Sequence, residues 1–186
     1  REYWEEYHRL TERRGVSARY AQIEMRRRNT AIGAMAIHRG EAAGMLCGTF
    51  GTHGLHLQYI DQILGRRRGA SAYYAMNALI LPKRTVFLCD TYVNYDPSAE
   101  QVAEMTLLAA EEIRRFGIVP KVALLSHSSF GTSDKPTALK MREALRLINE
   151  RAPDLEAEGE MHGDAALSAE VRAQAFPRSR LKGEAN

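Results

Sequence analysis

The segment 126–135 (SHSSFGTSDK) gathers hydroxyl groups and one glycine between an apolar run and the start of a helical pattern. Hydroxyls and the free N–H groups of a helix N-terminus donate hydrogen bonds, and the helix dipole favours an anion there. The segment therefore favours either a pocket for a phosphate, an acyl oxygen or a carboxylate, or an ordinary capped loop. It lacks the spacing of a P-loop. Its candidate ligand-binding residues are Ser126, Ser128, Ser129, Gly131, Thr132 and Ser133.

A second candidate follows the apolar run 85–89, where Asp90 and Asn94 stand close together. Ligands of open α/β sheets bind beyond the carboxyl ends of the strands, so an acid in this place can face a cleft. Asn94 can bind a ligand or shape the turn. Asp96 is better interpreted as the N-cap of the next helix, because Pro97 suits a first helical position.

A third candidate has glycines at 48, 51 and 54, between the apolar run 45–47, expected to be a strand, and a helix. Glycines let the backbone approach an anion, so Gly48 and Thr52 join the candidate residues. The spacing is not the dinucleotide fingerprint. The histidines at 38, 53 and 56 more often serve as cap or surface residues than as catalysts.

Acidic and imidazole groups alternate at Glu160, His162 and Asp164, which would place them on one face of a strand. No further ligand cluster completes a metal site, so no metal is predicted. Asp164 remains a candidate ligand-binding residue and a possible helix cap. No Ser-His-Asp arrangement, nucleophile elbow or activated cysteine is evident, and no catalytic residue is assigned.

Composition limits the class of protein that could carry these segments. The 186 residues are 45% hydrophobic and 26% charged, which suits one domain or two small lobes. The net charge of +3 is too mild to predict nucleic-acid binding. The arginine runs 26–28 and 66–68 indicate either solvated surface or a site for an anionic ligand.

The cellular setting is predicted from the cysteines and from the lack of targeting segments. Cys47 and Cys89 stand in apolar surroundings and are interpreted as buried thiols of an intracellular protein. No apolar run approaches the roughly 20 residues of a membrane span, and no signal peptide is visible. We expect a cytoplasmic location and neither nucleic-acid nor membrane partners.

Hydrophobic periodicity predicts helices over the first forty residues and alternating strands and helices after them. The expected strands are 45–47, 75–81, 85–89, 122–125 and 155–161, with a new one starting at 181–186; the expected later helices are 55–64, 97–116, 137–151 and 165–175. Strands 75–81 and 85–89 are close enough for a hairpin. Helical crossovers between apolar strands predict an α/β fold with a mostly parallel sheet.

The pattern changes near residue 58, and this predicts a division into lobes. Residues 1–58 are expected to form part of a first lobe, 59–180 a second α/β lobe, and 181–186 the start of a return to the first. Neither Arg1 nor Asn186 coincides with a start or stop signal, so we expect a fragment of something longer.

Four stretches in order resemble the phosphate acetyltransferase family: 40–48 (GEAAGMLCG), 87–101 (FLCDTYVNYDPSAEQ), 120–128 (PKVALLSHS) and 159–167 (GEMHGDAAL). The final GEAN at 183–186 resembles the start of a further family segment. The stretches 77–85 (NALILPKRT) and 160–164 (EMHGD) are more similar to the C-terminal domain of bacterial NADP-dependent malic enzymes. The resemblance covers nearly the whole chain.

This resemblance implies a two-lobed α/β/α sandwich with mostly parallel sheets, like that of isocitrate and isopropylmalate dehydrogenases, here truncated at its C-terminal end. It implies a cleft between the lobes that binds acetyl-CoA. Free-standing members move an acetyl group between CoA and phosphate. The family chain continues beyond position 186 into the first lobe and supplies part of the active site.

Two departures from the family bear on phosphate. Free-standing members usually carry an arginine where this chain has Gln58, and a basic residue where it has Phe130. Charged hydrogen bonds contribute about 1.5–3 kcal/mol each, so two lost cations should weaken phosphate binding if both faced the pocket. Gln58 is retained as a candidate ligand-binding residue.

The resemblance therefore implies a regulatory and oligomerisation domain of an NADP-dependent malic enzyme, with acetyl-CoA as effector and little or no transferase activity. The catalytic domains of the same chain would hold NADP and a divalent metal and convert malate to pyruvate and CO2, in a homo-oligomer. One alternative is an active phosphate acetyltransferase, in which Ser128, Ser129 and Thr132 hold the reacting groups. Another is a purely structural assembly module that pairs subunits through helices 97–116 and 137–151.

Overall fold

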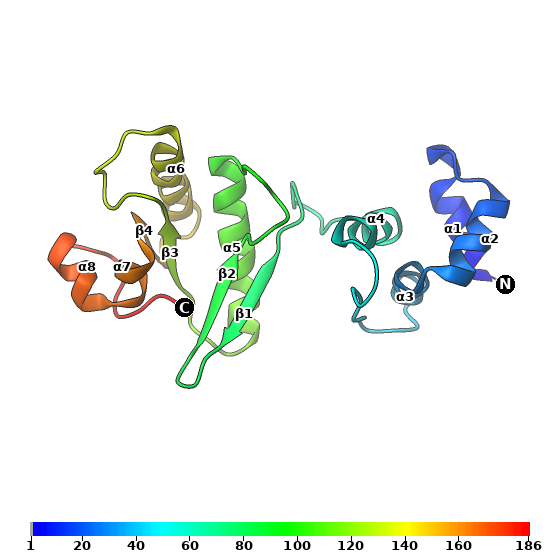
Figure 1. Ribbon diagram of the computed structural model, residues 1–186, viewed down its shortest axis with the longest axis horizontal. Coiled ribbons are helices and arrows are strands. Elements are labelled where there is room, and N and C mark those ends of the chain that lie inside the picture. The colour runs from blue at the N-terminus through cyan, green and yellow to red at the C-terminus, as the bar shows by residue number, and fades with distance from the viewer. Residues whose placement is uncertain (1) are drawn as a thin grey trace. The chain divides into compact units, whose positions relative to one another are not determined.

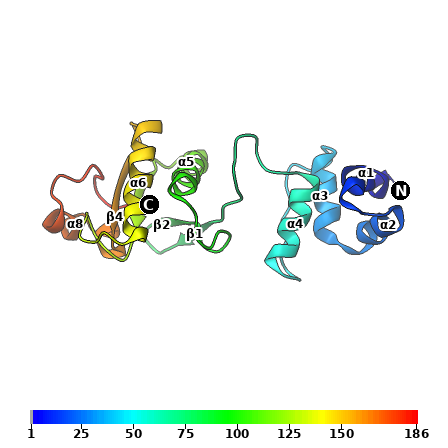
Figure 2. The same ribbon diagram turned by 90° about the horizontal axis from the view of Figure 1, so that it is seen from above.

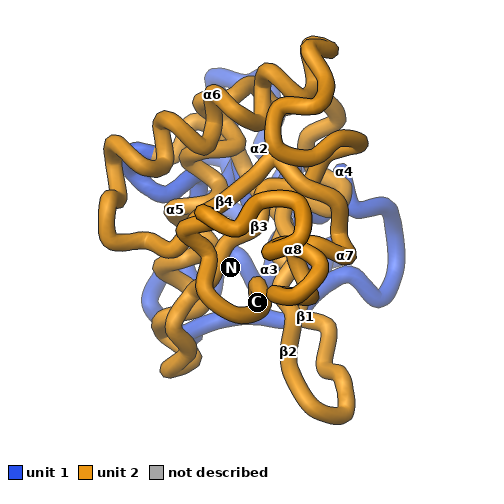
Figure 3. The backbone as a smooth tube through the Cα atoms, turned by 90° about the vertical axis from the view of Figure 1, so that its left-hand side faces the viewer, with its two compact units in different colours: residues 1–69 blue, residues 70–186 orange. Residues whose placement is uncertain are grey.

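The computed structural model describes residues 2–186, and the chain forms two compact units, residues 1–69 and 70–186 (Figures 1 and 3). The predicted change of lobe at residue 58 falls inside a helix of the first unit, whereas the units divide after Gly69. Residues 181–186, expected to lead back to the first lobe, belong to the second unit. Each unit is described separately below.

The first unit is helical. It contains α1 (Glu2–Thr11), the 3-10 turn η1 (Glu12–Arg14), α2 (Ala18–Arg27), α3 (Asn29–His38) and α4 (His53–Ile63). The Ser17 side chain accepts a hydrogen bond from the Tyr20 N–H and caps α2, as the sequence predicts. In Figure 2, α3 and α4 lie side by side. Their contact helps form a core of Tyr7, Ala21, Ala31, Ala34, Met35, Tyr59 and Ile63.

The strand expected at 45–47 is wrong, because these residues form part of an irregular loop. Leu46 is fully exposed, and no other strand is assigned among residues 2–69 that could pair with this run. Met45 packs against the helical core instead, next to Gly33. The expectation of buried thiols is also wrong, since Cys47 and Cys89 are both free and exposed.

The second unit mixes strands and helices. Its elements are β1 (Met76–Ile80), β2 (Thr85–Cys89), α5 (Ala99–Arg115), β3 (Lys121–Leu125), α6 (Pro136–Arg151), β4 (Glu156–Met161), α7 (Gly163–Leu167) and α8 (Ala169–Ala175). Strands β1 and β2 form the predicted antiparallel hairpin, with Ala78 opposite Phe87. Strands β3 and β4 are parallel and joined through α6, with Val122 opposite Ala157. The predicted α/β fold class is confirmed.

Helices α5 and α6 pack on each other, and both contact strands. The main core of this unit consists of Val102, Ala103, Met105, Ala110, Leu124, Ala144, Leu147, Ile148, Leu155 and Ala157. A smaller cluster joins the end of β4 to α7 and the last residues of the chain: Met161, Ala165, Ala166, Leu181 and Ala185.

Three helix boundaries differ from the sequence expectations. Helix α5 is capped by Ser98 in a capping box with Gln101, and Asp96 forms an ion pair with Lys140 instead. The helix expected at 165–175 is divided at Ser168, whose side chain caps α8. Asp164 is not a cap, because it lies in the first turn of α7 and accepts a hydrogen bond from the adjacent Ala165 N–H.

The last residues are held in the second unit by a buried arginine of α8. Arg172 is 2% exposed and donates to the carbonyl oxygens of Ala165 (2.7 Å), Leu181 (3.1 Å) and Gly183. These bonds satisfy a buried cation with backbone acceptors. They fix the path of the chain from α8 toward β3, although residues 181–186 are not themselves assigned as a strand.

Candidate functional site

The serine-rich loop, residues 126–135, connects β3 to α6 and is attached to the end of β4. The Ser126 N–H donates to the Met161 carbonyl (3.0 Å), and Ser129 Oγ accepts from the His162 N–H (3.1 Å). Gly131 has a φ of +84°, in the left-handed region that favours glycine. Its N–H donates to Glu160 Oε1 (2.9 Å). The loop is therefore shaped before any ligand arrives.

Glu160 is the residue that this site adds to the predicted set. It is fully buried, its carbonyl accepts from the Phe130 N–H (2.7 Å), and its Oε2 lies 3.9 Å from Arg142 Nε. Arg142 also donates to the Ser133 carbonyl (2.9 Å) and pairs with Asp134. The sequence suggested Glu160 only as a possible acid–base group or metal ligand. In the structure, its hydrogen bond to Gly131 holds the loop in place.

Most hydroxyls of the loop are occupied within it. Thr132 Oγ1 accepts from the Ser129 N–H (3.3 Å), and Ser133 Oγ accepts from the Lys135 N–H (3.3 Å) and lies 3.2 Å from His127 Nε2. Ser128 differs, since it is 6% exposed and its Oγ has no hydrogen-bond partner among the described residues. A buried hydroxyl without a partner is an unsatisfied hydrogen-bonding group, which is rare in folded proteins.

The predicted pair Asp90 and Asn94 forms a network that shapes the turn after β2. Asp90 accepts from the backbone N–H groups of Ala75 (3.0 Å), Val93 (3.2 Å) and Asn94 (2.9 Å), and from the Asn94 side chain. Burial acts to raise the pKa of the Asp90 carboxyl, but these hydrogen bonds outweigh it and hold the pKa below its usual value. The carboxylate stays ionised, with both oxygens already occupied.

Strands β2 and β3 both run upward in Figure 1, so Asp90 and the serine-rich loop follow the same ends of the two strands. Asp164 lies in the first turn of α7, directly after β4. The structure thus brings the predicted residues of this unit to the carboxyl ends of its strands, where α/β sheets bind ligands.

Phe130, where free-standing family members carry a cation, takes part in apolar packing. Its ring stacks on Phe176 with centroids 4.9 Å apart, and it packs against the cluster around Met161. Its φ of +50° is exceptional for a bulky residue. The position contributes an apolar contact and no positive charge to the loop.

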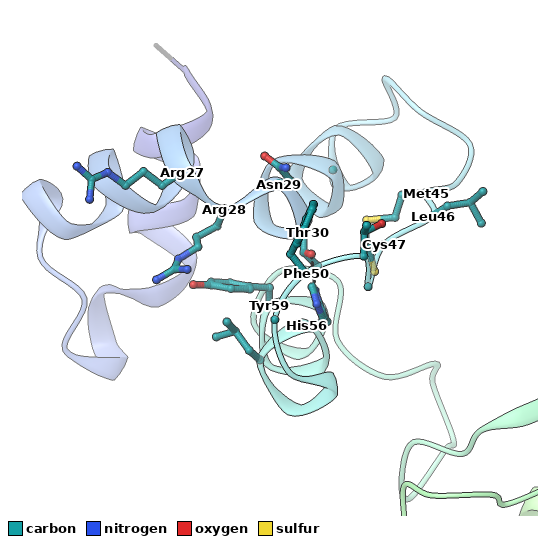
Figure 4. A pocket seen from close by; sticks show the side chains of 15 residues that line it. Arg27, Arg28, Asn29, Thr30, Met45, Leu46, Cys47, Phe50, His56 and Tyr59 are labelled. Atoms are coloured by element: carbon teal, nitrogen blue, oxygen red, sulfur yellow. Dashed lines mark hydrogen bonds between the residues drawn. The ribbon is translucent and has the colours of Figure 1, made fainter.

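The first unit contains a separate cavity of about 340 Å³ beside the loop before α4 (Figure 4). Gly48 lines it, but Thr52 and Gln58 are not among its lining residues, and Gln58 is exposed on α4. The lining also includes Arg27 and Arg28. The sequence allowed two interpretations of these arginines, a solvated surface or a site for an anionic ligand. In Figure 4, Arg28 extends toward Tyr59 whereas Arg27 points away from the loop.

His56 lies among polar groups in this cavity. The sequence analysis did not include it among the candidate ligand-binding residues. His56 Nδ1 lies 2.7 Å from Thr30 Oγ1, and its buried Nε2 has no partner among the described residues. The Tyr59 hydroxyl donates to the buried Glu24, which also pairs with Arg28 at 3.6 Å. Burial first, then the bond to Glu24, raises the pKa of Tyr59, which stays protonated. An imidazole nitrogen in the first turn of a helix, in a cavity that an arginine also lines, suits an anionic group.

Among residues 2–186, no three His, Cys, Asp or Glu side chains are placed to hold a metal ion. No helix in the same range is both long and apolar enough to cross a bilayer.

An α/β unit with a hydroxyl-rich loop at the carboxyl ends of its strands is typical of α/β proteins that bind ligands at this edge of the sheet. The family model described as phosphate acetyl/butaryl transferase matches residues 1–186, so the chain belongs to this family.

Known relatives refine this assignment. The NADP-dependent malic enzyme of Escherichia coli (strain K12) is 52% identical over 186 residues, which are 100% of this chain and 24% of the relative. The phosphate acetyltransferase of Synechocystis sp. is 36% identical over 183 residues, which are 98% of this chain and 26% of that protein. The chain is thus similar to about a quarter of each. It is close to the phosphate acetyltransferase-like part of malic enzymes.

Solved structures agree with the fold. The EutD phosphotransacetylase from Staphylococcus aureus superposes with a TM-score of 0.83 at 26% identity, covering 100% of this chain and 57% of that one. The resemblance inferred from the sequence, to the family and to malic enzymes within it, is confirmed.

Proposed function

We propose that this chain is a regulatory and oligomerisation domain of a malic enzyme, and that it binds acetyl-CoA as an allosteric effector. Its own transferase activity is little or none. The parent enzyme converts malate to pyruvate and CO2, and other domains of the same polypeptide hold NADP and the divalent metal. The observation that carries this proposal is the 52% identity to a malic enzyme over the whole chain, against 36% to a phosphate acetyltransferase.

The chemistry of the two units supports binding without efficient transfer. Phosphate recognition relies on charge-assisted hydrogen bonds, and arginine is the residue best suited to them. At the two departures from the family, Gln58 is neutral and exposed, and Phe130 is committed to stacking on Phe176. Neither position supplies a cation. The serine-rich loop keeps donors that suit an acyl-CoA, including the unpartnered Ser128 hydroxyl.

Regulation requires that acetyl-CoA bind one arrangement of the parent enzyme better than another. A coupling of 1–3 kcal/mol would change the apparent affinity for malate by roughly 5–150-fold. The effector then acts through an equilibrium between arrangements of the oligomer, and the bound thioester is not consumed.

The proposal is tested on the intact enzyme by measuring malate-dependent NADP reduction with and without acetyl-CoA. We expect acetyl-CoA to change the apparent affinity for malate or the maximal rate. A parallel assay for acetyl phosphate should detect no formation above background. Rapid formation of acetyl phosphate would instead favour an active transferase, and no response in either assay would leave only an assembly role.

A chemically matched pair of variants locates the effect in the first unit. Arg28→Gln removes a cation that lines the cavity and faces Tyr59, and Arg26→Gln removes an exposed cation of the same arginine run that is not among the lining residues. If the cavity receives an anionic group of the effector, the first change should weaken the response about tenfold, as for one charged hydrogen bond. The second should leave it nearly unchanged.

A further inference from the structure

His127 and Ser133 form a hydrogen-bonded pair within the serine-rich loop. His127 Nε2 and Ser133 Oγ lie 3.2 Å apart, at the upper end of the distance over which a base takes a proton from a nucleophile. Ser133 is half-buried and His127 is exposed, so a small substrate can reach both side chains. No local sequence motif indicates this pair, because the loop has to turn back on itself to join the two positions.

The hydrogen bonds around the pair assign the positions of its protons. Ser133 Oγ already accepts from the Lys135 N–H (3.3 Å), so its own hydrogen is donated, and His127 Nε2 is the acceptor. A neutral imidazole carries one proton, which then lies on Nδ1. This nitrogen is 3.3 Å from Thr137 Oγ1 and 3.5 Å from Ser126 Oγ, and both oxygens can accept its hydrogen. His127 therefore presents its basic nitrogen to the serine.

Hydrogen bonds to the backbone hold both residues of the pair in place. The His127 carbonyl accepts from His162 Nε2 (2.9 Å), and the Ser133 carbonyl accepts from Arg142 Nη2 (2.9 Å). Thr137 lies in the first turn of α6, a regular element of the unit. The nucleophile, the base and the hydroxyl behind the base are thus arranged before any substrate arrives.

The beginning of α6 places positive potential beside Ser133. This helix of 16 residues starts at Pro136, and a helix N-terminus carries a partial positive charge. The Lys135 N–H is 3.3 Å from Ser133 Oγ, so it lies near any carbonyl group that this oxygen attacks. An oxyanion that develops on such a carbonyl is stabilised by dipoles that are already oriented.

We propose that Ser133 and His127 are the catalytic residues of a slow esterase for small carboxylic esters. Ser133 Oγ forms a bond to the acyl carbon, and its proton moves to His127 Nε2. The C–O bond of the ester breaks, the leaving alcohol takes this proton, and the acyl group stays on Ser133. Water then gives a proton to Nε2 while its oxygen attacks the acyl carbon. The carboxylic acid leaves, and the proton returns to Ser133 Oγ.

Thr137 is a positioning residue in this arrangement. Its hydroxyl lies behind His127, where the Ser-His-Asp triad has a carboxylate, and fixes the proton on Nδ1. A hydroxyl brings no negative charge, so it stabilises the imidazolium less than an aspartate does, and the reaction is slow. The inference is separate from the proposed function, which concerns a thioester that is bound and released unchanged.

Acetylation by p-nitrophenyl acetate tests the proposal on the intact polypeptide, after the exposed thiols of Cys47 and Cys89 have been alkylated. We expect release of p-nitrophenolate and an acetyl group on the peptide that contains Ser133. Ser133→Ala should abolish this acetylation, and His127→Gln should slow it about 100-fold, as for the loss of a general base. The matched control, His8→Gln, removes a histidine of α1 and should leave the rate unchanged.

Two variants of Thr137 separate positioning from a general effect on the fold. Thr137→Val should slow acetylation of Ser133 about tenfold, as for the loss of one neutral hydrogen bond. Thr137→Ser keeps a hydroxyl in the same place and should restore the rate of the natural chain. Equal rates for the valine and serine variants would show that Thr137 does not position His127.

Two outcomes would overturn the esterase proposal. One is the absence of an acetyl group on Ser133 in the natural chain, a result that needs no variant to fold. The other is an equal loss of rate in His127→Gln and His8→Gln, because any surface imidazole would then account for the reaction. Acetyl-CoA is absent from the assay, so the proposed function is tested independently of this result.

Discussion

The buried carboxylate of Glu160 accepts a hydrogen bond from the backbone N–H of Gly131, with 2.9 Å between the two atoms. The bond links the end of β4 to the loop that carries most of the candidate ligand-binding residues. Because Glu160 is fully buried, water does not replace this acceptor when it is lost.

Substitution of Glu160 should therefore loosen the loop and destabilise the second unit. Glu160→Ala leaves the Gly131 N–H unpaired and opens a cavity, at an expected cost of about 2–4 kcal/mol in the free energy of unfolding. Glu160→Gln keeps an acceptor oxygen and should cost clearly less. Urea unfolding of both variants measures the difference. Equal losses would show that the bond to Gly131 does not matter.

Gly159 is predicted to tolerate no side chain. A Cβ there would lie 2.7 Å from the Leu124 carbonyl oxygen, and its φ of +148° is unfavourable for other residues. Gly159→Ala should cost about 2–4 kcal/mol through this clash and backbone strain. The control is Gly163→Ala in α7, where a Cβ meets nothing within 4 Å. Thermal unfolding that ranks the two variants in the reverse order would contradict the packing described for β3 and β4.

Two substitutions at the N-terminus of α5 test whether Ser98 or Asp96 caps the helix. Ser98→Ala removes the side chain of the capping box and should destabilise by about 1 kcal/mol. Asp96→Ala removes only an ion pair with Lys140 in which the aspartate is largely exposed, and should cost less than about 1 kcal/mol. Paired denaturation curves in high salt sharpen the comparison, because salt screens the ion pair but not the cap. A larger loss for Asp96 would restore the sequence-based assignment.

The ionised Asp90 carboxylate should contribute to the free energy of unfolding of the second unit, and this contribution should fall at low pH. Its pKa in the folded chain lies below the usual value, so its contribution is complete above the unfolded pKa of about 3.9. The contribution is lost as the pH falls through the lower pKa of the folded state. The difference in unfolding free energy between the natural chain and Asp90→Asn should therefore shrink from pH 5 toward pH 2. A constant difference would show that Asp90 does not titrate as described.

The sequence predicted those elements whose signals are local. The hairpin 75–89 and the helix 137–151 follow from apolar periodicity and lie close to the observed β1, β2 and α6. The apolar run 45–47 carried the same kind of signal, but a strand needs a neighbour and this run has none in its unit. The sequence analysis placed the N-cap of α5 at Asp96 because Pro97 suits a first helical position, whereas the observed capping box joins Ser98 and Gln101.

The candidate site was predicted less completely because its key contacts are long-range. The hydroxyls of the serine-rich loop were visible as a cluster, and the structure places them together. The role of Glu160 depends on Gly131, which is 29 positions away along the chain. The burial of His56 Nε2 without a partner among the described residues likewise depends on how α3 and α4 pack. No local pattern encodes such distances.

The measurement that tests the central claim most directly is calorimetric titration of the intact protein with acetyl-CoA, repeated in the presence of phosphate. The proposal predicts saturable binding whose affinity does not change with phosphate, and no acetyl phosphate in the recovered sample. Binding accompanied by turnover to acetyl phosphate would contradict it and establish a working transferase. The absence of any binding would also contradict it and leave the domain a role in assembly alone.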